Sequence, residues 1–203
     1  PATQTFLREL ALHLGDIHGQ FDQQKLFSAS EQMALLDQFA GLDEAVRPVG
    51  AFYAVWRDLR EKLEETFAAV WSAEADDDPL NRLVLLAGIS ARETVLLRAY
   101  SRFLRQARIP YSVEYMEDAL ADNPDIARLL VALFHAMFDP GTGASAKARD
   151  TAAAGISDQI EAALEAVASL DVDNILRRFR NAVQATLRTN CYQPDADGGQ
   201  KAY

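Results

Sequence analysis

The sequence is poor in cysteine, with only Cys191 among its 203 residues. A single thiol cannot form an internal disulfide, and without clustered histidines or further cysteines it indicates no structural zinc site. Long hydrophobic runs are also missing: the longest spans residues 129–134, whereas a membrane helix needs roughly 18 apolar residues. These absences exclude an internal disulfide and a membrane-spanning helix, and we expect the protein in a reducing cytoplasm.

Positive charge is scarce as well, because 20 lysines and arginines face 30 aspartates and glutamates, for a net charge of −10. A surface of this sign repels phosphate, so nucleic acid and anionic membranes are not expected as partners. The chain starts with proline, and no signal-peptide pattern follows. We therefore expect it to be part of a longer polypeptide.

Strand-like alternation between hairpin signals does not occur, and apolar residues recur at helical spacing almost throughout. The sequence therefore predicts an all-α fold, a multi-helix bundle-like array of antiparallel helices. Residues 1–72 are interpreted as an N-terminal helical segment, 73–140 as a central one, and 141–203 as a hairpin-like segment with a tail. The longest apolar stripe follows Pro48 and has a charged opposite face; its members are Phe52, Val55, Trp56, Leu59, Leu63, Phe67 and Val70.

Capping signals place several helix ends. Asp78 before Pro79 predicts a helix start, and Ser90 with Glu93 fits a capping box. Ser112 and Asn123-Pro124 predict two further starts, residues 139–143 a linker, and Asp171 the cap of the last helix. The helix after Ser90 is predicted to bury Val95, Leu96, Tyr100, Phe103 and Leu104. The last helix is predicted to bury Ile175, Phe179, Val183 and Leu187 and to expose Arg177, Arg178, Arg180 and Arg188.

The most suggestive short motif is GDIHGQ at residues 15–20. It resembles the metal-binding signature of calcineurin-like phosphoesterases, in which the Asp and His bind a two-metal centre. That chemistry needs further Gly-Asp and Gly-Asn-His strings at strand ends, and neither follows. The chain also has only three histidines, and a helical pattern precedes Gly15. We interpret the motif as a glycine-bounded turn between helices.

Other polar groupings also have simple structural interpretations. His135 and Asp139 could form a surface pair one helical turn apart, and Cys191 has no histidine nearby that would make it a nucleophile. Residues 76–78 could attract calcium but lack the rest of an EF-hand loop, so they are read as a solvated helix approach. The arginines of the last helix either complement its dipole or form a surface that binds an anionic partner. We assign no catalytic, cofactor-binding or metal residue.

Two stretches resemble a known family in order and spacing. The first runs from NRLVLLAGIS at 81–90 to LRAYSRFLRQ at 97–106. The second leads through 168–171 and 175–177 to ATLRTN at 185–190 and then Tyr192-Gln193, and residues 115–118 and 130–134 fit between the two. From about Phe67 to Tyr203, the chain resembles the helical region before the catalytic core of the large bacterial NAD-specific glutamate dehydrogenases.

The resemblance implies an oxidoreductase that deaminates L-glutamate to 2-oxoglutarate and ammonia with NAD as hydride acceptor. It implies that the substrate segment and the dinucleotide-binding domain follow this region, so the segment itself binds no cofactor and is expected to be inactive alone. Its expected partners are the catalytic core of the same chain and further copies in a homo-oligomer, where it would support assembly or regulation. The alternative is a free-standing helical protein-interaction module.

Overall fold

The computed structural model describes residues 32–33, 36, 39–41 and 43–193. The chain divides into two compact units, Pro1–Trp56 and Arg57–Tyr203, and helix α3 (Asp43–Trp71) contributes residues to both. From residue 43 to residue 193 there are seven α-helices, two short 3-10 helices and no strand, which confirms the all-α prediction. No helix of the described residues is long and apolar enough to cross a membrane.

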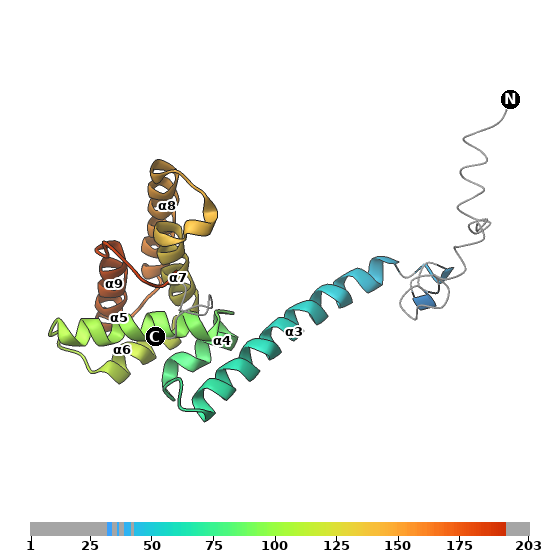
Figure 1. The fold of residues 1–203 in the computed structure, drawn as a ribbon, viewed down its shortest axis with the longest axis horizontal. Coiled ribbons are helices and arrows are strands. Elements are labelled where there is room, and N and C mark those ends of the chain that lie inside the picture. The colour runs from blue at the N-terminus through green and yellow to red at the C-terminus, as the bar shows by residue number, and fades with distance from the viewer. Residues whose placement is uncertain (1–31, 34–35, 37–38, 42, 194–203) are drawn as a thin grey trace. The chain divides into compact units, whose positions relative to one another are not determined.

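Within the second unit, eight elements follow α3. They are η2 (Pro79–Arg82), α4 (Leu83–Leu86), α5 (Ala91–Gln106), α6 (Val113–Ala121), α7 (Pro124–Phe138), η3 (Pro140–Thr142), α8 (Ala146–Leu164) and α9 (Leu170–Gln184). Helices α7 and α8 lie side by side, and α9 packs against α5, α6, α7 and α8 (Figure 1). One hydrophobic core therefore joins residues that are far apart in the sequence.

That core is built mainly on α7 and α9. Apolar residues at three- and four-residue spacing form one face of each helix, and burying this face stabilises the packed helices. The side chains that are at most 1% exposed include Leu130, Leu133 and Phe134 on α7, Ile160 on α8, and Ile175, Leu176, Phe179 and Val183 on α9. The predicted burial of Ile175, Phe179 and Val183 on α9 is confirmed, and that of Leu187 is not.

The helix starts predicted at Asp78, Ser90, Ser112 and Asn123-Pro124 are confirmed. The Asp78 carboxylate accepts a hydrogen bond from the Leu80 backbone N–H at 3.0 Å, and Ser90 and Glu93 form the complete capping box. The Ser112 hydroxyl accepts from the Tyr115 N–H at 3.1 Å. These contacts satisfy backbone donors that have no partner inside the helix.

The start and end of α9 differ from the prediction. Its N-cap is Ser169, whose hydroxyl accepts a hydrogen bond from the Val172 N–H, so the assignment of the cap to Asp171 was wrong. Asp171 accepts instead from the Tyr111 hydroxyl at 3.0 Å. Helix α9 ends at Gln184, and Leu187 is 91% exposed rather than buried. The apolar spacing that includes Leu187 therefore continues beyond the last residue of the helix.

Helix α5 turns a different face to the core than predicted. Its buried residues include Thr94, Leu97, Arg98 and Ser101, together with the predicted Leu104. Phe103 is 54% exposed, because Asp78 draws Arg98 inward and this sets the rotation of the helix. The apolar face predicted to be buried is left partly open.

The long apolar stripe on α3 is helical as predicted. In the first unit, Phe52 is 75% and Trp56 52% exposed. In the second unit, Thr66 is buried and the Lys62 ammonium donates a hydrogen bond to the Gly88 carbonyl at 2.7 Å. The stripe is therefore only partly covered by the described residues. The predicted first helix and the GDIHGQ motif at 15–20 lie outside the described residues.

Candidate functional site

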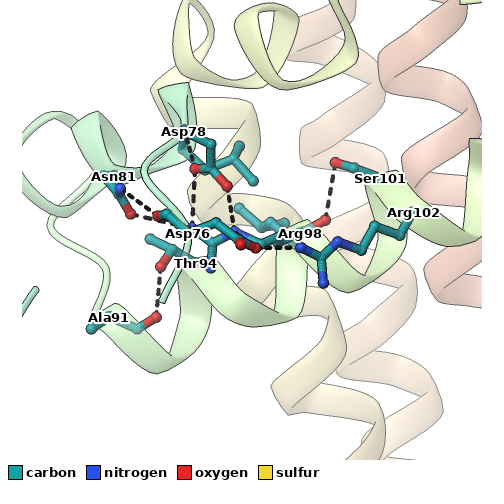
Figure 2. Close-up of polar contacts among 10 residues, drawn as sticks. Asp76, Asp78, Asn81, Ala91, Thr94, Arg98, Ser101 and Arg102 are labelled. Carbon is teal, nitrogen blue, oxygen red and sulfur yellow. Dashed lines mark hydrogen bonds and ion pairs between the residues drawn. The ribbon is translucent and has the colours of Figure 1, made fainter. Parts of the chain in front are cut away.

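A cluster of charged groups is buried where α5, α6 and the loop before η2 meet. Figure 2 shows Arg98 of α5 pointing at Asp78. The Arg98 side chain is 4% exposed and donates through Nε and Nη2 to the two carboxylate oxygens of Asp78, the Nη2 contact measuring 3.0 Å. Its Nη2 also donates to Asn81 Oδ1 at 3.2 Å. Burying a guanidinium is tolerable only with such bidentate pairing.

Asp76 and Asp77 are exposed, as expected for a solvated approach to a helix, but Asp78 is not. Asp78 is 12% exposed and both caps η2 and pairs with Arg98. Asp76 pairs with the exposed Arg102. Among the described residues, no group of three or more His, Cys, Asp or Glu is placed to hold a metal ion. The ion pairs of Arg98 with Asp78 and of Arg102 with Asp76 tie the loop to α5.

Glu117 of α6 borders this cluster. It is only 4% exposed, and the charges of Arg98 and Asp78 both act on its carboxyl group. Burial, and to a lesser extent the nearby Asp78 carboxylate, raise the pKa of Glu117 to about 7 against the opposing effect of Arg98. Glu117 consequently changes its charge near neutral pH.

A second polar constellation links α5, α7 and the segment after α9. The ring of His135 lies between two partners, with Nε2 2.8 Å from Glu93 Oε1 and Nδ1 2.5 Å from the Tyr192 hydroxyl. The His135 hydrogen bond is the main reason that the pKa of Glu93 falls to about 2, so this carboxylate is ionised at neutral pH. An ionised carboxylate only accepts, which places a proton on Nε2. Nδ1 can then accept from Tyr192.

No local sequence pattern indicates this constellation, because Glu93 and Tyr192 lie 42 and 57 residues from His135 in the sequence. The predicted pair of His135 with Asp139 is wrong: Asp139 caps η3 by accepting from the Gly141 N–H. Glu93 was recognised only as half of a capping box. Its second oxygen does serve that box, accepting from the Ser90 N–H at 2.6 Å, while Oε1 faces His135.

Two more contacts hold the segment after α9. The guanidinium of Arg92 donates to the backbone carbonyl of Cys191 at 2.6 Å. The Tyr192 ring stacks on Phe134, with ring centroids 6.2 Å apart. The thiol of Cys191, between these two contacts, is free and buried. We refer to Arg92, Glu93, His135 and Tyr192 as the tail clamp.

Replacing Tyr192 by phenylalanine is expected to destabilise the second unit by about 1 kcal/mol, since one hydrogen bond is lost while the ring stacking remains. Hydrogen exchange of the amides around residues 190–193 should become faster, as measured by mass spectrometry. Tyr115→Phe is the matched control, because its hydroxyl makes no hydrogen bond to the described residues. Equal effects of the two substitutions would contradict a role for the His135 contact.

The arginines of α9 are largely paired within the fold. Arg177 lies 2.9 Å from Asp173, and both Arg177 and Arg180 pair with Glu161 of α8. The helix has no basic residue in its last turn, so the helix-dipole interpretation was wrong. These ion pairs join α8 to α9. Arg188 lies beyond the helix, on the wall of an apolar groove.

This groove, which we call the junction groove, has a volume of about 570 Å³. Its floor is the face of α5 that was predicted to be buried. Its wall is formed by the end of α9 and the chain that follows this helix. The Tyr100 hydroxyl lies 2.8 Å from Thr186 Oγ1 across it. Its apolar lining includes Val95, Leu96, Phe103, Phe134, Ala185 and Leu187. It is a concave and mostly apolar surface, with Thr186, Arg188 and Asn190 among its polar lining residues.

Comparison with known families identifies two matching segments. Residues 75–140 match the model of glutamate dehydrogenase, helical motif 3, and residues 159–203 match that of the bacterial NAD-glutamate dehydrogenase, catalytic domain. Both segments lie in the second unit. Both matched segments are therefore of the class found in glutamate dehydrogenases, and the match to the catalytic domain begins within α8.

Relatives in curated collections agree. The NAD-specific glutamate dehydrogenase of Mycobacterium tuberculosis is 44% identical over 131 residues, 64% of this chain and 8% of that protein. That of Pseudomonas aeruginosa is 40% identical over 147 residues, 72% of this chain and 9% of that protein. The chain belongs to the NAD-specific glutamate dehydrogenase family. It spans less than a tenth of the length of these relatives.

A shorter similarity points elsewhere. The DNA repair protein RecN of Rickettsia prowazekii is 32% identical over 79 residues, 39% of this chain and 14% of that protein. No solved structure matches the chain.

Proposed function

We propose that this chain is a non-catalytic helical segment of an NAD-specific glutamate dehydrogenase. The whole enzyme would oxidatively deaminate L-glutamate to 2-oxoglutarate and ammonia, with NAD as hydride acceptor bound outside this segment. The segment would support the catalytic core and its assembly into a homo-oligomer in the cytoplasm. It would contribute packing surfaces rather than reacting groups.

The observation that supports this role is the core shared by the two family segments. Phe179 and Val183, from the part matching the catalytic domain, are at most 1% exposed and belong to the same core cluster as Leu97 and Phe134 of the helical motif. Helix α9 packs against α5, α6 and α7. The start of the catalytic domain is thus built on the helical motif, so the motif would determine where the rest of that domain begins.

Activity measurements test the proposal directly. The full-length polypeptide encoded by the gene should reduce NAD when supplied with L-glutamate, and the purified chain of residues 1–203 should not. In the full-length protein, Phe179→Ala should lower the thermal stability and the yield of active enzyme, since it opens a cavity costing about 3–5 kcal/mol.

Leu170→Ala is the control for this substitution, because Leu170 lies on the same helix and is 75% exposed. It should leave both quantities near the wild-type values. Turnover of glutamate by the isolated chain would contradict the non-catalytic role. A gene whose reading frame does not continue into a dehydrogenase core would overturn the proposal as a whole.

The second candidate is a free-standing helical interaction module. It is favoured by the exposed aromatic side chains on α3 in the first unit, where Phe52 and Tyr53 are 75% and 60% exposed. Exposed apolar patches of this kind commonly mark protein–protein contacts. A reading frame ending near Tyr203, together with retrieval of one defined partner that is lost in Phe52→Ser, would support this candidate.

A further inference from the structure

We propose that the junction groove is the docking site for the part of the catalytic domain that follows residue 203 in the full-length dehydrogenase. This inference rests on the proposed function and adds to it the surface at which the two parts meet. It concerns the described residues of the second unit only.

The groove is left open on its most apolar side. Phe103 on its floor is 54% exposed and Leu187 on its wall is 91% exposed. Leaving both in water forfeits the favourable free energy of burying large apolar side chains. The periodicity of α5 predicted burial for Phe103, which is the pattern expected of a helix face that is covered in the complete protein.

The groove continues an interface that the catalytic domain already forms. Its floor, from Val95 to Phe103, belongs to the segment matching the helical motif, and its wall, from Ala182 to Cys191, belongs to the segment matching the catalytic domain. Helix α9 packs on α5 immediately beside it. An additional layer of the catalytic domain would extend this existing contact over the exposed face of α5.

The wall is also held in place before anything binds. The tail clamp fixes the chain just beyond it, through Arg92 to the Cys191 carbonyl and through His135 to Tyr192. Thr186 is held to Tyr100 across the groove. A wall held at both ends keeps the groove formed, which lowers the entropic cost of covering it.

The position of the wall in the sequence indicates which segment would cover the groove. The match to the catalytic domain continues to residue 203, and the part of this chain that aligns with the relatives covers only 8–9% of their length. The wall of the groove is the stretch of chain that leads directly into the remainder of that domain. A covering segment from the same domain is therefore tethered close to the groove at high effective concentration.

Cysteine labelling tests the proposal. In a Cys191→Ser background, Leu187→Cys and Phe103→Cys are introduced separately into the isolated chain and into the full-length protein. A maleimide reagent modifies each, and the rate at that site is followed by mass spectrometry. Both cysteines should react about tenfold more slowly, or slower still, in the full-length protein than in the isolated chain.

Gln106→Cys is the matched control, since it is exposed on α5 and does not line the groove. It should react at similar rates in both proteins. Equal labelling of Leu187→Cys in an active full-length enzyme would overturn the docking site and leave the proposed function intact. Equal protection of Gln106→Cys would overturn it too, as would a dimer of the isolated chain that protects Leu187→Cys, because a second copy would then be the occupant.

Discussion

Replacing Arg98 by alanine is expected to destabilise the second unit by about 3–5 kcal/mol, the cost of breaking a buried ion pair from one side. Asp78 would remain 12% exposed without the guanidinium that neutralises it. The buried Glu117 beside it would add like charge at neutral and higher pH. The loss is a large fraction of the 5–15 kcal/mol that stabilises an ordinary domain.

The measurement is urea unfolding of the chain at neutral pH, followed by far-ultraviolet circular dichroism. Arg102→Ala is the matched control, one helical turn away, because Arg102 and its partner Asp76 are 60% and 54% exposed. An exposed pair of this kind contributes less than about 1 kcal/mol. Similar losses for the two variants would show that burial of Arg98 does not determine the stability of this region.

Replacing Glu117 by glutamine is expected to stabilise the second unit by about 3 kcal/mol above pH 7. The pKa of Glu117 is raised from 4.5 to about 7 on folding, so the folded chain binds a proton more tightly than the unfolded chain. The wild-type protein therefore has its full stability contribution from this group below pH 4.5 and loses it as the pH rises through about 7. Glutamine has nearly the same shape and cannot ionise.

Unfolding free energies measured between pH 4 and pH 8 should show the difference growing with pH for Glu117→Gln. Glu114→Gln, exposed on the same helix, should differ from wild type by only a few tenths of a kcal/mol, since it loses a surface charge in the first turn. A constant difference for Glu117→Gln across this range would contradict protonation of the buried carboxyl. It would indicate a packing effect instead.

Helix ends and the main core could be predicted because they depend on neighbouring residues. The capping box of Ser90 with Glu93 and the proline after Asp78 act within one turn of chain. The spacing of Ile175, Phe179 and Val183 places three side chains on one face, whatever lies opposite them. Such signals need no knowledge of the fold.

The rotation of α5 shows where this kind of prediction stops. Apolar spacing favoured the face with Phe103, but the buried face includes Arg98, because a carboxylate from a loop 20 residues earlier compensates its charge. The predicted burial of Leu187 was wrong for a related reason. Its helical spacing continues past Gln184, where α9 ends, and the chain then lines the groove. Neither outcome is decided by local residues.

By itself, the sequence determined that this chain is all-helical, acidic and related to NAD-specific glutamate dehydrogenases, since composition, caps and ordered family matches are all properties of the linear chain. Only the tertiary structure decided which polar groups meet. Glu93, His135 and Tyr192 come together because α5, α7 and the end of the chain share one core. Contacts of this range depend on packing, and packing brings residues together without regard to their separation in sequence.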